Sequence, residues 1–89
     1  MISSNVKIIN KLGLHARAAT RLVNCASEYV SEIIVKKGAR SVNGKSIMGV
    51  LTLAAATGTE LTIEANGADE KRALQAVIAL IMNRFGEDE

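Results

Sequence analysis

The chain has 89 residues, 48% hydrophobic and 22% charged, a balance typical of one small folded domain spanning residues 1–89. The net charge is only +2 and the only aromatic residues are Tyr29 and Phe85, which argues against a nucleic-acid-binding domain. A single cysteine excludes an internal disulfide and a multi-cysteine metal site, so we expect neither metal nor cofactor. With no long apolar stretch and no charged leader, we expect a cytoplasmic protein that does not insert into a membrane.

The first half of the chain predicts a strand, a helix and a hairpin. Val6-Lys7-Ile8 alternates apolar and polar residues, as a half-buried strand does. An amphipathic helix then ends near Glu28, and its apolar stripe consists of Ala19, Leu22, Val23 and Ala26. Residues 33–35 and 40–42 read as two strands, because Gly38 between them suits the positive φ of a tight turn.

The second half predicts two helices around a strand. Ser46 opens a short helix over residues 47–54, and residues 60–65 alternate strictly as a strand. Asp69 and Glu70 favour the start of a last helix that Gly86 is placed to end. The apolar face of that helix consists of Ala73, Leu74, Val77, Ile78, Ile81 and Phe85. The order β-α-β-β-α-β-α predicts an α+β fold, an open-faced two-layer sandwich of a four-stranded antiparallel sheet covered on one face by three helices.

The only histidine lies at the start of the first helix, in Gly13-Leu14-His15-Ala16-Arg17. A helix N-terminus offers unpaired N–H groups and a partial positive charge, which attract an anion and disfavour the imidazolium. Arg17 adds a planar cationic donor that suits phosphate oxygens. The pattern therefore predicts a neutral, nucleophilic histidine that accepts and passes on a phosphoryl group. A capping or surface histidine would show the same local sequence.

This histidine motif, the downstream segment Asn43-Gly44-Lys45-Ser46-Ile47-Met48-Gly49 and the element order together resemble the HPr family, the phosphocarrier proteins of the bacterial phosphotransferase system. The resemblance implies the sheet order 1-4-2-3. It also implies that His15 receives a phosphoryl group on Nδ1 from Enzyme I, charged by phosphoenolpyruvate, and passes it to Enzyme IIA while Arg17 contacts the phosphoryl oxygens. Many family members carry proline after this arginine, whereas this chain has Ala18.

Ser46 is the natural N-cap of the short helix, since its hydroxyl can accept an N–H from Met48 or Gly49. The resemblance adds a regulatory role, because the matching serine is phosphorylated in bacteria that carry the HPr kinase/phosphorylase. The helix is apolar around most of its circumference, with Val50, Leu53 and Ala54 expected to face the sheet. We expect an exposed patch for docking Enzyme I and Enzyme IIA, formed by Ile47, Met48 and Leu51 with Thr20 and Arg21.

Three alternatives remain open at this stage. The carrier could serve sugar uptake as a monomer, or be the nitrogen-related paralogue that feeds a regulatory Enzyme IIA. It could instead be an interaction protein that binds regulators in response to Ser46 phosphorylation, although His15 argues against this as its only role. The third alternative, a small nucleic-acid-binding domain, fits poorly with the charge and the scarce aromatic residues.

Overall fold

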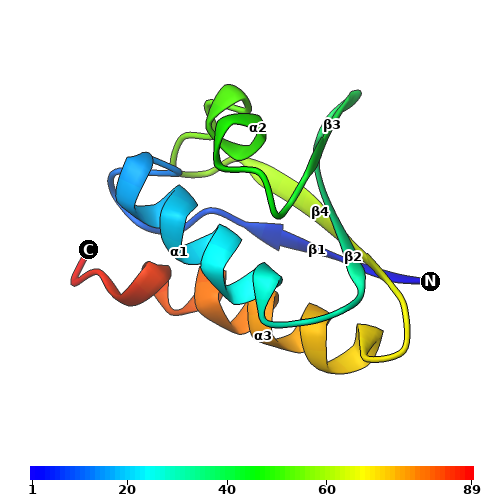
Figure 1. The fold of residues 1–89 in the computed structure, drawn as a ribbon. Helices are drawn as coiled ribbons and strands as arrows, with labels where there is room; N and C mark the ends of the chain where they lie inside the picture. Colours follow the sequence, from blue (N-terminus) through cyan, green and yellow to red (C-terminus); the bar gives the residue numbers. More distant parts are fainter.

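Four strands, three α-helices and one 3-10 turn make up the fold, in a computed structural model that describes all 89 residues. In chain order the elements are β1 (Ile2–Lys7), α1 (Ala16–Ser27), β2 (Glu32–Lys37), β3 (Arg40–Asn43), α2 (Ile47–Thr52), β4 (Glu60–Asn66), α3 (Glu70–Met82) and the 3-10 turn η1 (Arg84–Gly86). The predicted β-α-β-β-α-β-α order is confirmed (Figure 1). None of the helices has the length and apolar character needed to cross a membrane.

The strands form a single sheet in the order β1-β4-β2-β3, with every neighbouring pair antiparallel. This confirms the order that the family resemblance implied. The central strand β4 pairs with β1 from Ile2 opposite Ala65 to Lys7 opposite Glu60. β2 and β3 form the predicted hairpin, and Gly38 takes the positive φ of +58° that its turn requires.

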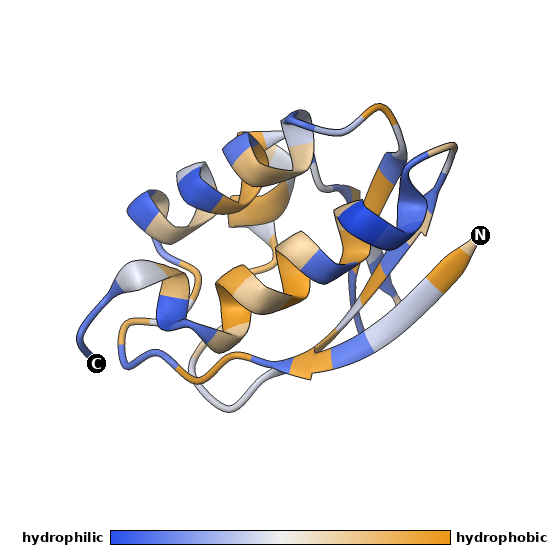
Figure 2. Cartoon of the chain, turned by 90° about the horizontal axis from the view of Figure 1, so that it is seen from below, coloured by the Kyte–Doolittle hydropathy of each residue, from blue (hydrophilic) through white to orange (hydrophobic).

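The three helices lie on one side of the sheet (Figure 1), as predicted. Alternate strand residues point beneath them and are buried, among them Val6, Ile33, Val35, Leu61, Ile63 and Ala65. The predicted apolar stripe of α1 is buried as well. Figure 2 shows hydrophilic and hydrophobic segments alternating along the helices, as expected of amphipathic helices at a protein surface. The resulting core of 21 residues joins the two layers.

The first strand is longer at its start than predicted, and Ile8 lies outside it. β1 begins at Ile2, whereas the alternation predicted a strand over residues 6–8. Residues 3–5 are polar and exposed, so no hydrophobic pattern marks them as strand. Their extended conformation is set by pairing with β4, a non-local cause that local sequence does not show.

The short helix α2 ends before Ala54, so the expectation that Ala54 faces the sheet is wrong. α2 ends at Thr52, and Ala54 is exposed with a positive φ of 49°. Val50 and Leu53 are buried as expected. The chain leaves the helix here because Ala55 turns inward, where its carbonyl accepts the N–H of Leu14 at 2.8 Å.

The last helix is also shorter than predicted. α3 ends at Met82, so Gly86 does not end it, and Phe85 lies beyond it in η1. Phe85 is nonetheless fully buried, because the chain bends back with positive φ at Arg84 and Phe85. This bend turns the C-terminal residues towards the start of α1 (Figure 1).

Candidate functional site

His15 is the N-cap residue of α1, as the sequence predicted for a histidine at the helix start. Its backbone is extended (φ −81°, ψ −178°) and its carbonyl accepts the N–H of Ala19 at 2.8 Å. The N–H groups of Ala16, Arg17 and Ala18 have no acceptor within the protein, and no side chain caps the helix. His15 therefore stands beside three free donors at the positive end of a helix, the arrangement that binds anions.

The loop before His15 is fixed by close backbone packing. Gly13 has a positive φ of 69°, and a Cβ at this position would lie 2.7 Å from the carbonyl oxygen of Ala55. Only glycine meets both conditions without strain. The next residue, Leu14, is buried and donates its N–H to the same carbonyl. The segment after α2 thus determines where the chain enters α1, and so places His15.

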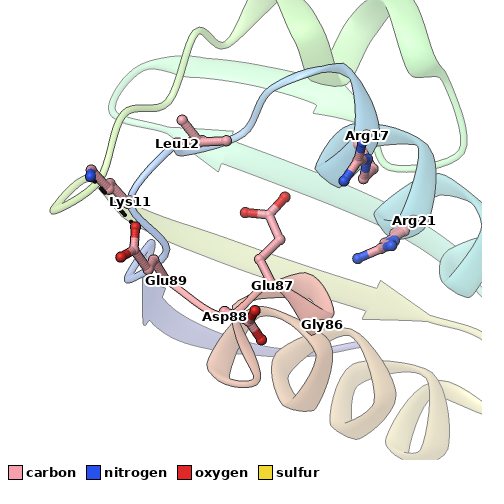
Figure 3. A pocket seen from close by; sticks show the side chains of 8 residues that line it. All are labelled: Lys11, Leu12, Arg17, Arg21, Gly86, Glu87, Asp88 and Glu89. Atoms are coloured by element: carbon pink, nitrogen blue, oxygen red, sulfur yellow. Dashed lines mark ion pairs between the residues drawn. The ribbon is translucent and has the colours of Figure 1, made fainter.

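Two arginines of α1 border an open cavity of about 570 Å³ beside this helix end (Figure 3). The cavity is lined by Lys11, Leu12, Arg17, Arg21, Gly86, Glu87, Asp88 and Glu89. Arg17 is exposed and makes no hydrogen bond or ion pair, so its guanidinium is free to meet an anion. Arg21 instead donates from Nη1 to the carbonyl of Phe85, which ties α1 to the C-terminal segment.

Two residues at this site were not predicted from the sequence, Asn10 and Glu87. Glu87 places one carboxylate oxygen against Nε2 of His15, while its other oxygen accepts a hydrogen bond from Asn10 Nδ2 at 2.9 Å. Asn10 is fully buried and also donates to the Gly13 carbonyl at 2.8 Å. The amide of Asn10 therefore links the loop, the C-terminal segment and, through Glu87, the imidazole.

The carboxyl group of Glu87 is held in its charged form by these contacts. Burial acts to raise its pKa, but the hydrogen bonds from Asn10 and His15, with the electrostatic effects of His15 and Arg21, outweigh burial. The pKa of Glu87 consequently lies below its ordinary value. At neutral pH an anionic group therefore faces Nε2 of the histidine.

Ser46 caps α2 as predicted. Its backbone is extended, and its hydroxyl oxygen accepts the N–H of Gly49 at 3.1 Å. Of the two donors that the sequence offered, Met48 and Gly49, the structure selects the second. Ser46 is half-buried, and no side chain of the His15 site forms a hydrogen bond with its hydroxyl.

The residues expected in the docking patch differ in exposure. Ile47 and Met48 are exposed at 40% and 72%, large values for apolar side chains. Leu51 is half-buried and packs against the core, so only part of its side chain is available to the docking patch. On the neighbouring α1, Thr20 is exposed and its hydroxyl donates to the Ala16 carbonyl at 2.9 Å, while Arg21 is engaged with Phe85.

A family model described as "PTS HPr component phosphorylation site" matches residues 2–83. The chain is 49% identical to the phosphocarrier protein HPr of Cupriavidus necator and 51% identical to that of Neisseria meningitidis, covering 100% of both chains in each case. A solved structure, HPr-C-His from Thermoanaerobacter tengcongensis, superposes with a TM-score of 0.96 at 42% identity and full coverage of both chains. The chain belongs to the HPr family, the phosphocarrier proteins of the phosphotransferase system.

Assembly differs among the structural relatives. Another structure from Thermoanaerobacter tengcongensis is described as an HPr dimer; it matches with a TM-score of 0.79 at 42% identity, covering 98% of this chain and 100% of the other. The expectation that this chain is a monomer therefore stays a prediction.

Proposed function

We propose that His15 is the phosphoryl acceptor of this phosphocarrier, taking the group from Enzyme I and passing it to Enzyme IIA in the cytoplasm. The observation that carries the proposal is the position of His15 at the N-cap of α1, beside the three free N–H groups of residues 16–18. Arg17, two residues after His15, is exposed at the same end of the helix, and its guanidinium is unpaired. Together these groups offer charge-assisted hydrogen bonds to phosphoryl oxygens.

The site supports reversible transfer better than tight storage. Phosphoryl transfer passes through a loose transition state, so positioning and electrostatic stabilisation supply most of what the protein contributes. His15 has 28% of its side chain exposed, and the cavity beside it is open. Water weakens ionic contacts made at such a surface, so the phosphoryl group is not held tightly. The same exposure leaves the phosphoryl group accessible to a second protein. This suits a relay whose turnover depends on its partners.

Substitution of His15 tests the proposal. The protein is incubated with phosphoenolpyruvate and Enzyme I, and intact mass is measured before and after acid treatment. We expect the wild type to gain one acid-labile phosphoryl group and His15→Ala to gain none. Folding of the variant is checked by circular dichroism. Equal labelling of the folded alanine variant would show that the acceptor lies elsewhere.

We also propose that Ile47 and Met48, with the edge of Leu51 and with Thr20 and Arg21, form the surface that Enzyme I and Enzyme IIA share. Because Met48 is 72% exposed, Met48→Asp should leave the fold unchanged. It should weaken partner binding by about tenfold, since it places a charge where the partner would exclude water. Titration calorimetry with Enzyme I measures this, and Met82→Asp, on the exposed end of α3, is the matched control. Wild-type affinity of the Met48 variant would place the docking surface elsewhere.

Phosphorylation of Ser46 by an HPr kinase/phosphorylase is proposed to act on the same surface. The phosphate would sit at the start of α2 next to Ile47, adding roughly two negative charges to an apolar patch. It should lower the affinity for Enzyme I without unfolding the helix, because negative charge is favourable at a helix N-terminus. The downstream branch, sugar uptake or nitrogen-related regulation, is decided by offering the phosphorylated chain both kinds of Enzyme IIA and measuring which one accepts the group.

A further inference from the structure

The C-terminal segment is held against the start of α1 by contacts on both sides of Glu87. Before it, the carbonyl of Phe85 accepts a hydrogen bond from Arg21. After it, the carbonyl of Glu89 accepts the backbone N–H of Lys11 at 2.6 Å, and the two side chains form an ion pair at 3.5 Å. Figure 3 shows Glu87 reaching from this segment into the space between the Leu12 loop and the arginines. The segment thus presents one carboxylate to the site.

That carboxylate has a specific orientation. One oxygen is engaged by Asn10 and the other by Nε2 of His15, and only 12% of the side chain is exposed. No hydrogen bond engages Nδ1 of the ring. In a neutral imidazole one nitrogen carries the proton and the other carries the lone pair, and a carboxylate can only accept. A carboxylate at Nε2 therefore keeps the proton on Nε2.

We infer that Glu87 is a positioning residue for phosphoryl transfer, holding the His15 ring with its proton on Nε2 and its lone pair on Nδ1. The inference rests on the proposed role of His15, for which the family resemblance implies Nδ1 as the acceptor atom, and it adds the residue that keeps Nδ1 unprotonated. The hydrogen bond made by one ring nitrogen commonly decides what the other can do. Asn10, fully buried, fixes the position of Glu87 in turn.

The contact between the Glu87 carboxylate and Nε2 also stabilises the positive charge that the ring acquires during transfer. The Nδ1 lone pair forms the bond to phosphorus as the bond between phosphorus and the donor breaks. The electron pair of the broken bond stays with the donor. The proton on Nε2 stays in place, so the ring acquires a positive charge that faces the Glu87 carboxylate. Transfer onward reverses these changes: the N–P bond breaks, its electrons return to Nδ1, and the ring is neutral again. No proton has to enter or leave the site.

Two variants of the full chain test this inference. Glu87→Ala removes both the acceptor and the charge. Asp88→Ala removes an equal charge from the same segment, and Asp88 makes no hydrogen bond or ion pair. Both are checked for folding by circular dichroism.

The first measurement, NMR of the ring nitrogens in ¹⁵N-labelled unphosphorylated protein, needs no phosphoryl donor. We expect a protected Nε2–H resonance in the wild type and in Asp88→Ala, and its loss in Glu87→Ala. An identical resonance in Glu87→Ala overturns the inference even if His15 is the acceptor. Failure of the wild type to be phosphorylated would count against the proposed function alone.

The second measurement follows transfer itself. Glu87→Ala should take up phosphate from Enzyme I about tenfold more slowly, because the ring loses the hydrogen bond that sets its tautomer; loss of the corresponding partner of a metal-bound histidine has an effect of similar size. A faster uptake in Glu87→Ala would show that the carboxylate obstructs the site, and the inference would be wrong.

Discussion

Removing the buried amide of Asn10 should destabilise the protein and loosen the His15 site together. Asn10→Ala deletes the donor to the Gly13 carbonyl at 2.8 Å and to the Glu87 carboxylate at 2.9 Å. The contact with Gly13 is buried. The Oδ1 atom of Asn10 is buried without a partner, so its removal offsets part of the loss. The net cost should be about 1–3 kcal/mol, the range for a buried hydrogen-bonding group deprived of its partner.

Thermal unfolding followed by circular dichroism measures this cost. For a domain of this size, each kcal/mol corresponds to about 4–8 °C, so we expect Tm to fall by roughly 5–20 °C. Asn24→Ala is the matched control, because Asn24 is exposed on α1 and makes no side-chain hydrogen bond. Its Tm should stay unchanged or rise slightly, since alanine is the better helix former. A wild-type Tm for Asn10→Ala would refute the claim that this amide joins the loop to the C-terminal segment.

Further predictions concern Arg17, Ser46 and Asp69. Arg17→Ala should slow transfer from Enzyme I by several-fold to about a hundredfold, or about 1–3 kcal/mol, at unchanged Tm; normal transfer at a lowered Tm would mark a structural arginine instead. Ser46→Ala removes the cap on the Gly49 N–H and should cost about 1 kcal/mol, which a Tm within error of the wild type would contradict. The hydroxyl of Ser31 lowers the pKa of Asp69, and the N–H groups of Val30 and Ser31 add to this against a weaker effect of burial. Asp69→Asn should therefore be less stable than the wild type above about pH 4, and the gap should close as the pH falls further; a pH-independent gap would contradict this assignment.

Most of the fold could be predicted from the sequence, because its signals are local. Strict alternation marked β4 to within one residue, and Ser46 marked the start of α2. The errors arose where distant contacts decide the local conformation. The start of β1 depends on pairing with β4, and Ala54 takes a positive φ although alanine favours helix.

The candidate site was likewise predictable from the sequence only where its arrangement is local. His15 and Arg17 fall within one turn of one helix, so their arrangement follows from the helix itself. Glu87 lies 72 residues from His15 in the chain. It reaches the imidazole only because Arg84 and Phe85 adopt positive φ, which non-glycine residues seldom do and which no sequence pattern marks. Acidic residues at the end of the chain gave no reason to expect one of them at the histidine.

The measurement that tests the central claim most directly is the site of phosphorylation, at the level of the ring nitrogen. The ¹⁵N-labelled protein is phosphorylated with phosphoenolpyruvate and Enzyme I, and the ring nitrogens are assigned by NMR at neutral pH. Phosphorus bonded to Nδ1 of His15, with the proton on Nε2, is the result we predict. Phosphorus on Nε2 or on any other residue would contradict the account.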